Sequence, residues 1–200
     1  IGIAKYRLDE MVDGILGDTE ATEFQLWLSD SKENNFRYSI HPDYKATRTQ
    51  PKPKHHEDLK EYLIKKWNAQ FAYGMEADDA LGIWQEEYLE TTYNLPDTII
   101  CTIDKDLDQI PGWHYNFVKK EKYFVTETEG LRYFYAQILI GDVSDNIQGC
   151  PGIGPVKAGN ALRGLVAEWD LYSGVQKLYT KQLPGSSQEE ITSRIRTTGQ

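Results

Sequence analysis

The chain has 200 residues, of which 40% are hydrophobic and 12% aromatic; this is enough for one substantial domain, or one domain with a small appendage, and unlike a disordered protein. No run approaches the roughly 18 apolar residues of a membrane span, no signal peptide is visible, and Cys101 and Cys150 make no disulfide framework. We therefore expect a cytoplasmic protein with no membrane partner. The net charge of −9 argues against nucleic acid as a partner, unless the acids gather where cations bind.

Hydrophobic periodicity predicts alternating helices and strands before Gly141. In chain order we expect a helix that ends near Gly17, a buried strand at 23–30, a polar, mobile excursion at 31–56, a helix at 56–71, a short strand at 71–74, a helix at 75–93, a buried strand at 98–103, a hairpin at 113–127 and a helix at 129–142. This alternation predicts an α/β fold with a mostly parallel sheet flanked by helices. After Gly141 we expect short helices and tight glycine turns.

Acidic side chains gather in four clusters: Asp30; Glu76 with Asp78 and Asp79; Asp104 with Asp106; and Asp142 with Asp145. Asp30 and Asp104 each follow a predicted strand, and the carboxyl ends of parallel strands share the edge where ligands bind. Acids that converge there would repel one another unless cations neutralise them, and Mg²⁺ prefers hard oxygen ligands. A single acid of this kind is more often a helix cap or a solvated loop residue. The four clusters together predict a site for one or two Mg²⁺ ions.

The stretch GCPGIGPVKAG (149–159) is typical of a helix-hairpin-helix. Gly152 and Gly154 allow positive φ and let backbone amides approach a phosphate closely. Pro155 suits the first turn of a helix, and Lys157 then lies within reach of a phosphate. Such contacts bind the DNA backbone and do not read its sequence. Two glycines and a proline by themselves would more often be an ordinary turn.

Residues 45–54 contain the basic residues Lys45, Arg48, Lys52 and Lys54 and no acid. Tyr44 adjoins them and could stack on a base. A solvated loop is the simpler alternative for this stretch alone. We assign no role to His41, His55 and His56, because no pair of cysteines accompanies them.

Taken together, these motifs resemble the flap endonuclease and 5′-3′ exonuclease family, its bacteriophage members in particular, and also the 5′ nuclease domain of bacterial DNA polymerase I. The resemblance covers residues 24–162 and rests on LSDSKENNFRYSIHPDYKATR, GMEADDALG, TIDKDLDQI and LIGDVSDNIQGCPGIGPVKAG. It implies a PIN-like 5′ nuclease core at 1–141, with a helical arch at about 38–56. Residues 142–200 would be a helix-hairpin-helix DNA-binding region with C-terminal helices.

The resemblance also implies roles for individual residues. The first metal region would contain Asp30, Glu76, Asp78, Asp79 and Asp104; the second would contain Asp106, Asp142 and Asp145. Lys45 and Arg48 would stabilise charge on the scissile phosphate, and Tyr44, Gly152, Ile153, Gly154 and Lys157 would bind DNA.

The activity implied is two-metal hydrolysis of DNA at 5′ ends or flaps, in which water attacks the phosphorus. The end nucleotides would unpair to reach the metals. The cofactors implied are two Mg²⁺ ions, with Mn²⁺ as a substitute, and K⁺ at the hairpin. An RNA strand in an RNA–DNA hybrid is a further substrate that the resemblance allows.

One feature of the family has no match here. Its members begin with a central strand in the pattern "apolar run–D–G", whereas Asp9, Asp13 and Asp18 lie on or after an amphipathic helix. Three explanations are open: the chain is a fragment of a longer nuclease, another polypeptide supplies the strand, or the protein lacks one ligand of the first metal. Of these we expect the fragment. Two alternatives stay open: a non-catalytic, structure-specific DNA-binding protein, and a PIN-like ribonuclease, which would explain the carboxylates but not the hairpin.

Overall fold

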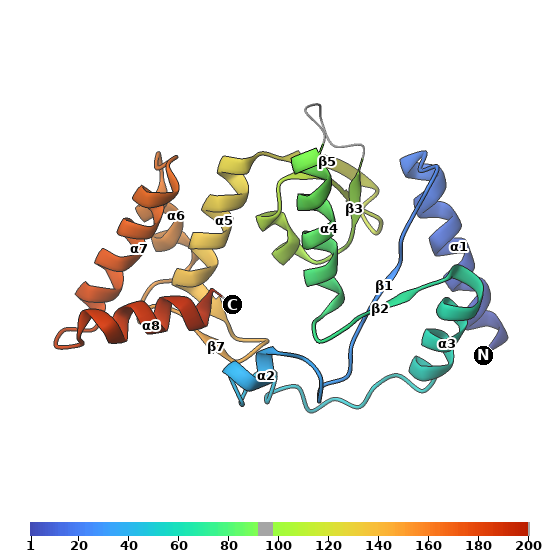
Figure 1. The fold of residues 1–200 in the computed structure, drawn as a ribbon, viewed down its shortest axis with the longest axis horizontal. Helices are drawn as coiled ribbons and strands as arrows, with labels where there is room; N and C mark the ends of the chain where they lie inside the picture. The colour runs from blue at the N-terminus through green and yellow to red at the C-terminus, as the bar shows by residue number, and fades with distance from the viewer. Residues whose placement is uncertain (92–97, 200) are drawn as a thin grey trace. The chain divides into compact units, whose positions relative to one another are not determined.

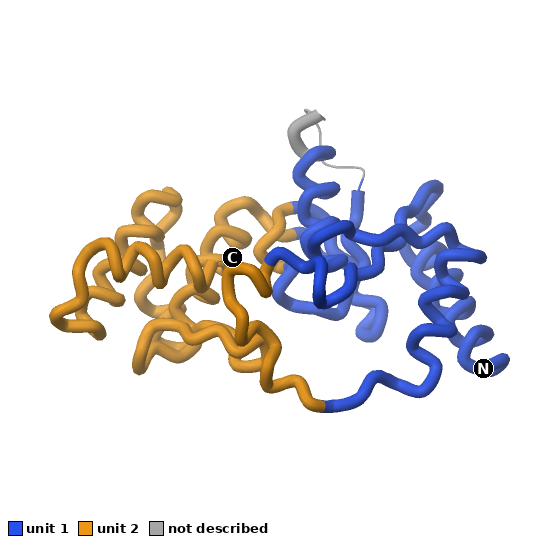
Figure 2. Tube along the Cα trace, turned by 60° about the horizontal axis from the view of Figure 1, so that its bottom comes forward, with its two compact units in different colours: residues 1–36, 50–107, 112–124 blue, residues 37–49, 108–111, 125–200 orange. Residues whose placement is uncertain are grey.

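Helices and short strands alternate along residues 1–91 and 98–199, which are the residues that the computed structural model describes (Figure 1). They form two compact units (Figure 2). Unit 1 comprises residues 1–36, 50–107 and 112–124, and unit 2 comprises residues 37–49, 108–111 and 125–200. The predicted functional boundary between residues 141 and 142 is a different division and stays a prediction. In the described ranges, no helix has both the length and the apolar character needed to cross a membrane.

Unit 1 holds most of the predicted α/β elements. They are α1 (Gly2–Thr19), β1 (Trp27–Ser29), α3 (His56–Trp67), β2 (Gln70–Ala72), α4 (Ala77–Thr91), β3 (Ile99–Cys101), the 3-10 helix η1 (Lys105–Gln109), β4 (Gly112–Asn116) and β5 (Glu121–Val125). The last residues of η1 and of β5 belong to unit 2. The predicted end of the 75–93 helix, at residues 92 and 93, lies outside the described residues.

The strands of unit 1 confirm the predicted parallel pairing. β1 runs parallel to β2 with Trp27 opposite Gln70, and β3 runs parallel to β4 with Ile99 opposite Trp113. β5 lies beside β4, as the predicted hairpin requires. The described strands form two separate sheets here, β1-β2 and β3-β4-β5, and helix α4 packs against strands of both.

Two carboxylates on α1 hold this helix to the rest of unit 1. Asp9 accepts hydrogen bonds from the Tyr62 hydroxyl at 2.7 Å and the Trp67 indole nitrogen at 2.9 Å, both on α3. Asp18 accepts one from the Tyr115 hydroxyl on β4. The helix runs past Gly17, where the sequence predicted its end, because the left-handed residue is Glu20 (φ 56°).

Unit 2 is a helical assembly with one two-stranded antiparallel sheet, β6-β7. Its elements are α2 (Arg37–Ile40), α5 (Glu127–Ile140), β6 (Gly141–Asp142), β7 (Ile147–Gln148), α6 (Pro155–Leu162), α7 (Glu168–Gln182) and α8 (Gln188–Thr198). Thr126 begins α5 with a capping box to Glu129. Leu139, Leu162 and Leu171 are fully buried where α5, α6 and α7 meet.

The segment predicted as a helical arch contains only one short helix. Residues 37–40 form α2, and residues 41–55 are turns and irregular backbone. Pro42, Pro51 and Pro53 explain this, because proline lacks the amide hydrogen that a helix interior needs.

Candidate functional site

Asp30 follows β1 and is held mainly by backbone amides. Its carboxylate accepts hydrogen bonds from the backbone N–H of Gly74 at 2.8 Å and of Ser31 at 2.7 Å, and from the Asn34 side chain at 3.2 Å. The hydrogen bonds from Gly74 and then Ser31 lower the pKa of Asp30, because they favour the ionised form. Asp30 is therefore a fixed anion at the carboxyl end of a parallel strand.

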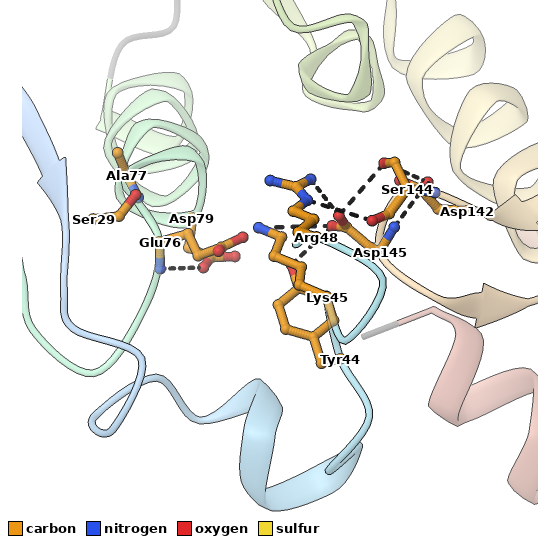
Figure 3. Close-up of polar contacts among 10 residues, drawn as sticks. All are labelled: Ser29, Tyr44, Lys45, Arg48, Glu76, Ala77, Asp79, Asp142, Ser144 and Asp145. Carbon is orange, nitrogen blue, oxygen red and sulfur yellow. Dashed lines mark hydrogen bonds and ion pairs between the residues drawn. The ribbon is translucent and has the colours of Figure 1, made fainter. Parts of the chain in front are cut away.

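Three acidic residues lie at the start of α4, and one of them caps the helix. Glu76 lies just before the helix, where it must lie to converge with Asp78 and Asp79. The Asp79 carboxylate accepts a hydrogen bond from the Glu76 backbone N–H at 2.9 Å, and the Ser29 hydroxyl accepts one from Ala77 N–H at 3.0 Å (Figure 3). Ser29, at the end of β1, thus joins the strand to the helix that carries the acids.

Asp104 comes shortly after β3 and begins the 3-10 helix η1. Its carboxylate accepts a hydrogen bond from Asp106 N–H at 3.0 Å, and its own N–H donates to the Thr102 hydroxyl at 3.0 Å. Both carboxylates thus sit in one local turn directly after a strand of the parallel pair.

Asp142 and Asp145 share one tight turn in unit 2 between β6 and β7. One oxygen of Asp142 accepts hydrogen bonds from the Ser144 N–H and hydroxyl, both at 2.7 Å, and from Asp145 N–H at 3.3 Å (Figure 3). These bonds turn the backbone back on itself. The turn presents two carboxylates three residues apart.

Glycine is required at the base of this turn because two backbone segments nearly touch. Gly141 has φ 71°, and a Cβ there would lie 2.2 Å from the nitrogen of Gly149. A Cβ on Gly149 would in turn lie 2.4 Å from the nitrogen of Gly141. Any side chain at either position would separate β6 from β7 and displace the two aspartates.

The predicted basic residues meet Asp145 within unit 2. Tyr44 donates its hydroxyl hydrogen to Asp145 Oδ2 at 2.9 Å, Arg48 forms an ion pair with Oδ1, and Lys45 Nζ lies 3.7 Å from Oδ2 (Figure 3). Asp145 thus holds one hydroxyl and two cations from a segment about a hundred residues away. Tyr44 is only 3% exposed, so stacking on a base would require its ring to leave this position.

The predicted DNA-binding hairpin lies between α5 and α6. Gly152 uses the positive φ that glycine allows, at 71°, whereas Gly154 is extended at φ −108° and lies directly before α6. Pro155 occupies the first turn of that helix, as predicted. Ile153 is 9% exposed and joins the core, and Lys157 Nζ donates to the Gly152 carbonyl at 2.8 Å.

The two units divide the predicted site residues between them. Unit 1 contains Asp30, Glu76, Asp78, Asp79, Asp104 and Asp106, and unit 2 contains Tyr44, Lys45, Arg48, Asp142, Asp145 and the hairpin. Within residues 1–91 and 98–199, no group of three or more His, Cys, Asp or Glu side chains lies close enough to hold a metal ion. A single site made from both sets stays a prediction.

Sequence reasoning missed several polar residues that organise the site. The Ser144 hydroxyl donates to the carboxylate of Asp142 and lies 3.4 Å from the carboxylate of Asp145. His41, to which we assigned no role, lies 3.0 Å from the Asn146 carbonyl through its Nε2 atom. The Asn146 side chain donates to the Asp43 carbonyl at 3.0 Å. The short S–D–N run after Asp142 was a local signal for Ser144, but nothing local pointed to His41.

Comparison with known proteins identifies related sequences. Residues 3–135 match the family model of the 5′-3′ exonuclease, N-terminal resolvase-like domain. DNA polymerase I of Borreliella burgdorferi is 32% identical over an alignment of 171 residues, and the match covers 76% of this chain and 18% of that protein. The 5′-3′ exonuclease of Buchnera aphidicola is 27% identical over an alignment of 166 residues, and the match covers 74% of this chain and 53% of that protein. The chain thus spans about a fifth of one relative and about half of the other.

Solved structures share the fold at low sequence identity. The T5 D15 protein co-crystallised with metal ions matches with a TM-score of 0.67 and 16% identity, over 98% of this chain and 82% of that chain. The bacteriophage T5 D15 flap endonuclease, in a pseudo-enzyme-product complex with DNA and metal ions, matches with a TM-score of 0.68 and 16% identity, over 98% and 80%. At this identity the likeness establishes the fold.

Proposed function

Because the chain belongs to the family of the 5′-3′ exonuclease N-terminal, resolvase-like domain, we propose that it hydrolyses phosphodiester bonds at 5′ ends or flaps of DNA. The observation that carries the proposal is the unit 2 cluster, where the Asp142–Asp145 turn lies beside Lys45 and Arg48. Carboxylates suit a divalent cation, and nearby basic side chains suit the phosphate that approaches it.

The donor set fits Mg²⁺ by its chemistry. Each predicted ligand is a carboxylate, and Mg²⁺ is commonly held by one or two carboxylates while it keeps several waters. Asp142 and Asp145, three residues apart in one turn, are such a pair. In our proposal, Asp30, Glu76, Asp78, Asp79 and Asp104 hold a first ion, and Asp106, Asp142 and Asp145 hold a second. When bound, these ions would offset the charge of the acids and of the phosphodiester.

The other site residues of the chain would position DNA and stabilise charge. Lys45 and Arg48 place two positive charges where negative charge develops on the scissile phosphate. Gly152 offers bare backbone at the hairpin, and Lys157 carries a charge beside it. Ile153 would act indirectly, because its burial fixes the hairpin against the core.

We further propose that another chain segment adds a strand between β1 and β3. In the described residues, β1 is hydrogen-bonded only to β2, and β3 forms one edge of its sheet, although α4 packs against both. An extended segment paired with both strands would unite the two sheets and satisfy their open backbone groups. An aspartate at its carboxyl end would join the first metal region.

Three finer features belong to the same proposal. Mn²⁺ replaces Mg²⁺, since both accept carboxylate and water ligands. K⁺ binds at the backbone of the hairpin around Gly152. The RNA strand of an RNA–DNA hybrid is also cut, because the proposed contacts are to the sugar-phosphate backbone rather than to base edges.

The proposal is tested by cleavage of a 5′-labelled flap duplex with Mg²⁺ and with a chelator. We expect short 5′ products only with Mg²⁺. Asp142→Ala should lower cleavage at least about 100-fold while DNA binding persists, since loss of one charge-stabilising group at a reacting centre has effects of this order. Asp170→Ala, an exposed acid on α7, is the matched control and should leave cleavage unchanged.

Two outcomes would change the assignment. Full cleavage by Asp142→Ala would remove the carboxylate pair from the mechanism. DNA binding by the unaltered chain without cleavage would favour the alternative of a non-catalytic, structure-specific DNA-binding protein, and adding an upstream strand that bears an aspartate would then be the next test.

A further inference from the structure

The segment 41–48 is attached to the turn 142–146 by contacts from both backbone and side chains. Asp145 accepts from the Tyr44 hydroxyl, pairs with Lys45 and Arg48, and through its carbonyl accepts from Lys45 N–H at 3.0 Å. The Arg48 Nε atom also donates to the Ser144 carbonyl at 3.3 Å. Both carboxylate oxygens of Asp145 are therefore engaged by this one segment.

The backbone of this segment is held in an uncommon conformation. Lys45 has φ 54°, a left-handed value that costs free energy for a residue with a side chain. The backbone N–H of this same residue donates a hydrogen bond to the Asp145 carbonyl, and this contact keeps the strained conformation in place. Release of the segment would relieve the strain.

Asp145, Lys45 and Arg48 pair with one another here, but the proposed nuclease needs each of them for another partner. A divalent cation needs the Asp145 oxygens that Tyr44, Lys45 and Arg48 now occupy, and a phosphate needs the charges of Lys45 and Arg48. The Asp145 side chain is only 16% exposed, so little of its surface remains accessible. It cannot bind a cation and keep its contacts with Tyr44, Lys45 and Arg48 at the same time.

We propose that residues 41–48 form a latch on Asp145, which is closed while no cation holds this carboxylate. A divalent cation that takes Asp145 opens the latch and frees Lys45 and Arg48 for a phosphodiester. Tyr44 is then a positioning residue, whose hydroxyl sets how firmly the latch closes. This inference rests on the proposed function, because it assigns Asp145 to a cation and the two basic residues to a phosphate.

The latch links the binding of cation and DNA. Since the cation removes a competitor of the phosphate, each ligand increases the affinity for the other, and thermodynamic linkage makes the two increases equal. The free protein therefore keeps its basic segment away from anions until the carboxylate turn is loaded.

The test follows the opening of the latch without DNA. Trypsin cleaves after lysine and arginine, so the rate of cutting after Lys45 and Arg48, read by mass spectrometry, reports the release of this segment. In the unaltered chain we expect slow cutting in chelator and faster cutting as Mg²⁺ is added. In Tyr44→Phe the half-maximal Mg²⁺ concentration should fall about tenfold, because a hydrogen bond to a charged group is lost from the closed state alone.

Tyr62→Phe is the matched control. Tyr62 likewise donates its hydroxyl to an aspartate that also pairs with a lysine, at Asp9 in unit 1. Its loss should leave cutting after Lys45 and Arg48 unchanged. Asp145→Asn is a second variant, which should be cut quickly at these sites with and without Mg²⁺.

The outcomes separate the latch from the nuclease. The latch would be overturned if the rate of tryptic cutting in the unaltered chain does not depend on Mg²⁺, or if Tyr44→Phe requires the same Mg²⁺ concentration as the unaltered chain. Either result would count against the latch even if the protein cleaves flap DNA. Mg²⁺-dependent opening in a chain that cleaves no flap would retain the latch and count against the proposed function.

Discussion

Unit 2 is built around one cluster of large buried apolar side chains, whereas unit 1 has fewer buried apolar side chains and adds carboxylates that form hydrogen bonds between its elements. Among the described residues, the largest side chains that are less than 2% exposed lie mostly in unit 2 (Tyr179, Leu139, Leu162, Leu171, Ile191 and Val175), and His114 lies in unit 1. The four helices α5 to α8 share this core. Its stabilisation comes from removing apolar surface from water, which does not depend on ionisation.

The carboxylates of unit 1 perform a related task with different chemistry. The Lys66 ammonium, with Tyr62 and Trp67, lowers the pKa of Asp9, and the Tyr115 hydroxyl, with Lys120, lowers the pKa of Asp18. Backbone amides do the same for Asp30. Each interaction joins elements distant in sequence, and each favours the ionised carboxylate.

The difference shows how one chain can present two kinds of acid. Asp30 is held mainly by backbone N–H groups, which cannot leave without unfolding the loop around Gly74. Asp145 is held by side chains, which can rotate away and exchange partners. The proposed latch belongs to the second kind.

The largest expected effect is a core truncation in unit 2. Leu162→Ala should lower the free energy of unfolding by about 3 kcal/mol, since it removes a fully buried side chain and leaves a cavity. Leu28→Ala, on the half-buried strand β1 of unit 1, is the matched change and should cost about half as much or less. Urea unfolding measures both values. A larger loss for Leu28→Ala would reverse the comparison of the two units.

A smaller loss of stability is expected from a substitution in the Asp142–Asp145 turn than from the core truncation, and almost none from a substitution in the segment around Gly154. Gly141→Ala should cost about 2 kcal/mol, because its Cβ would lie 2.2 Å from Gly149 nitrogen at φ 71°. Gly154→Ala, where a Cβ meets nothing within 4 Å, should stay within about 0.5 kcal/mol. Urea unfolding should single out the first variant. Equal behaviour of the two would mean that β6 and β7 can separate without consequence.

The smallest expected effect is a gradual loss of the stability of unit 1 as the pH is lowered. Asp9, Asp18 and Asp30 have pKa values lowered by folding, so the unfolded chain takes up protons more readily. Stability present above the ordinary carboxyl pKa, near 4, is lost as the pH falls through the lowered values. Trp169→Phe leaves Trp27, Trp67, Trp84 and Trp113, all in unit 1, as fluorescent reporters.

In this variant the urea midpoint read by fluorescence should begin to fall near the ordinary carboxyl pKa of about 4 and continue to fall as the pH passes through the lowered values. Asp30→Asn, which cannot ionise, should begin with a lower midpoint at neutral pH and lose less of it in acid. A midpoint that rises in acid would show that the ties of unit 1 do not depend on ionised carboxylates.

The elements that sequence predicted best are those with local causes. Helix α5 follows its hydrophobic periodicity, and β3 follows an apolar, β-branched run. The predicted end of α1 at Gly17 was wrong because Glu20 takes the left-handed conformation instead. The helical arch was reduced to α2, although Pro51 and Pro53 already argued against a long helix there.

The sequence by itself determined the parts of the site that need only neighbours in the chain. The D–V–S–D spacing places Asp142 and Asp145 in one turn, Gly152 takes its positive φ, and Glu76 precedes α4. Backbone geometry and hydrogen bonds over a few residues are enough for this, so a motif carries the information.

Only the tertiary structure decided which groups face these acids. The partners of Asp145 lie about a hundred residues earlier, and the Tyr44 that sequence assigned to DNA is buried against it. The two separate sheets of unit 1 and the burial of Ile153 are decided in the same way. Packing brings distant segments together to remove apolar surface from water and to pair buried charges, and no local spacing records which segments will meet.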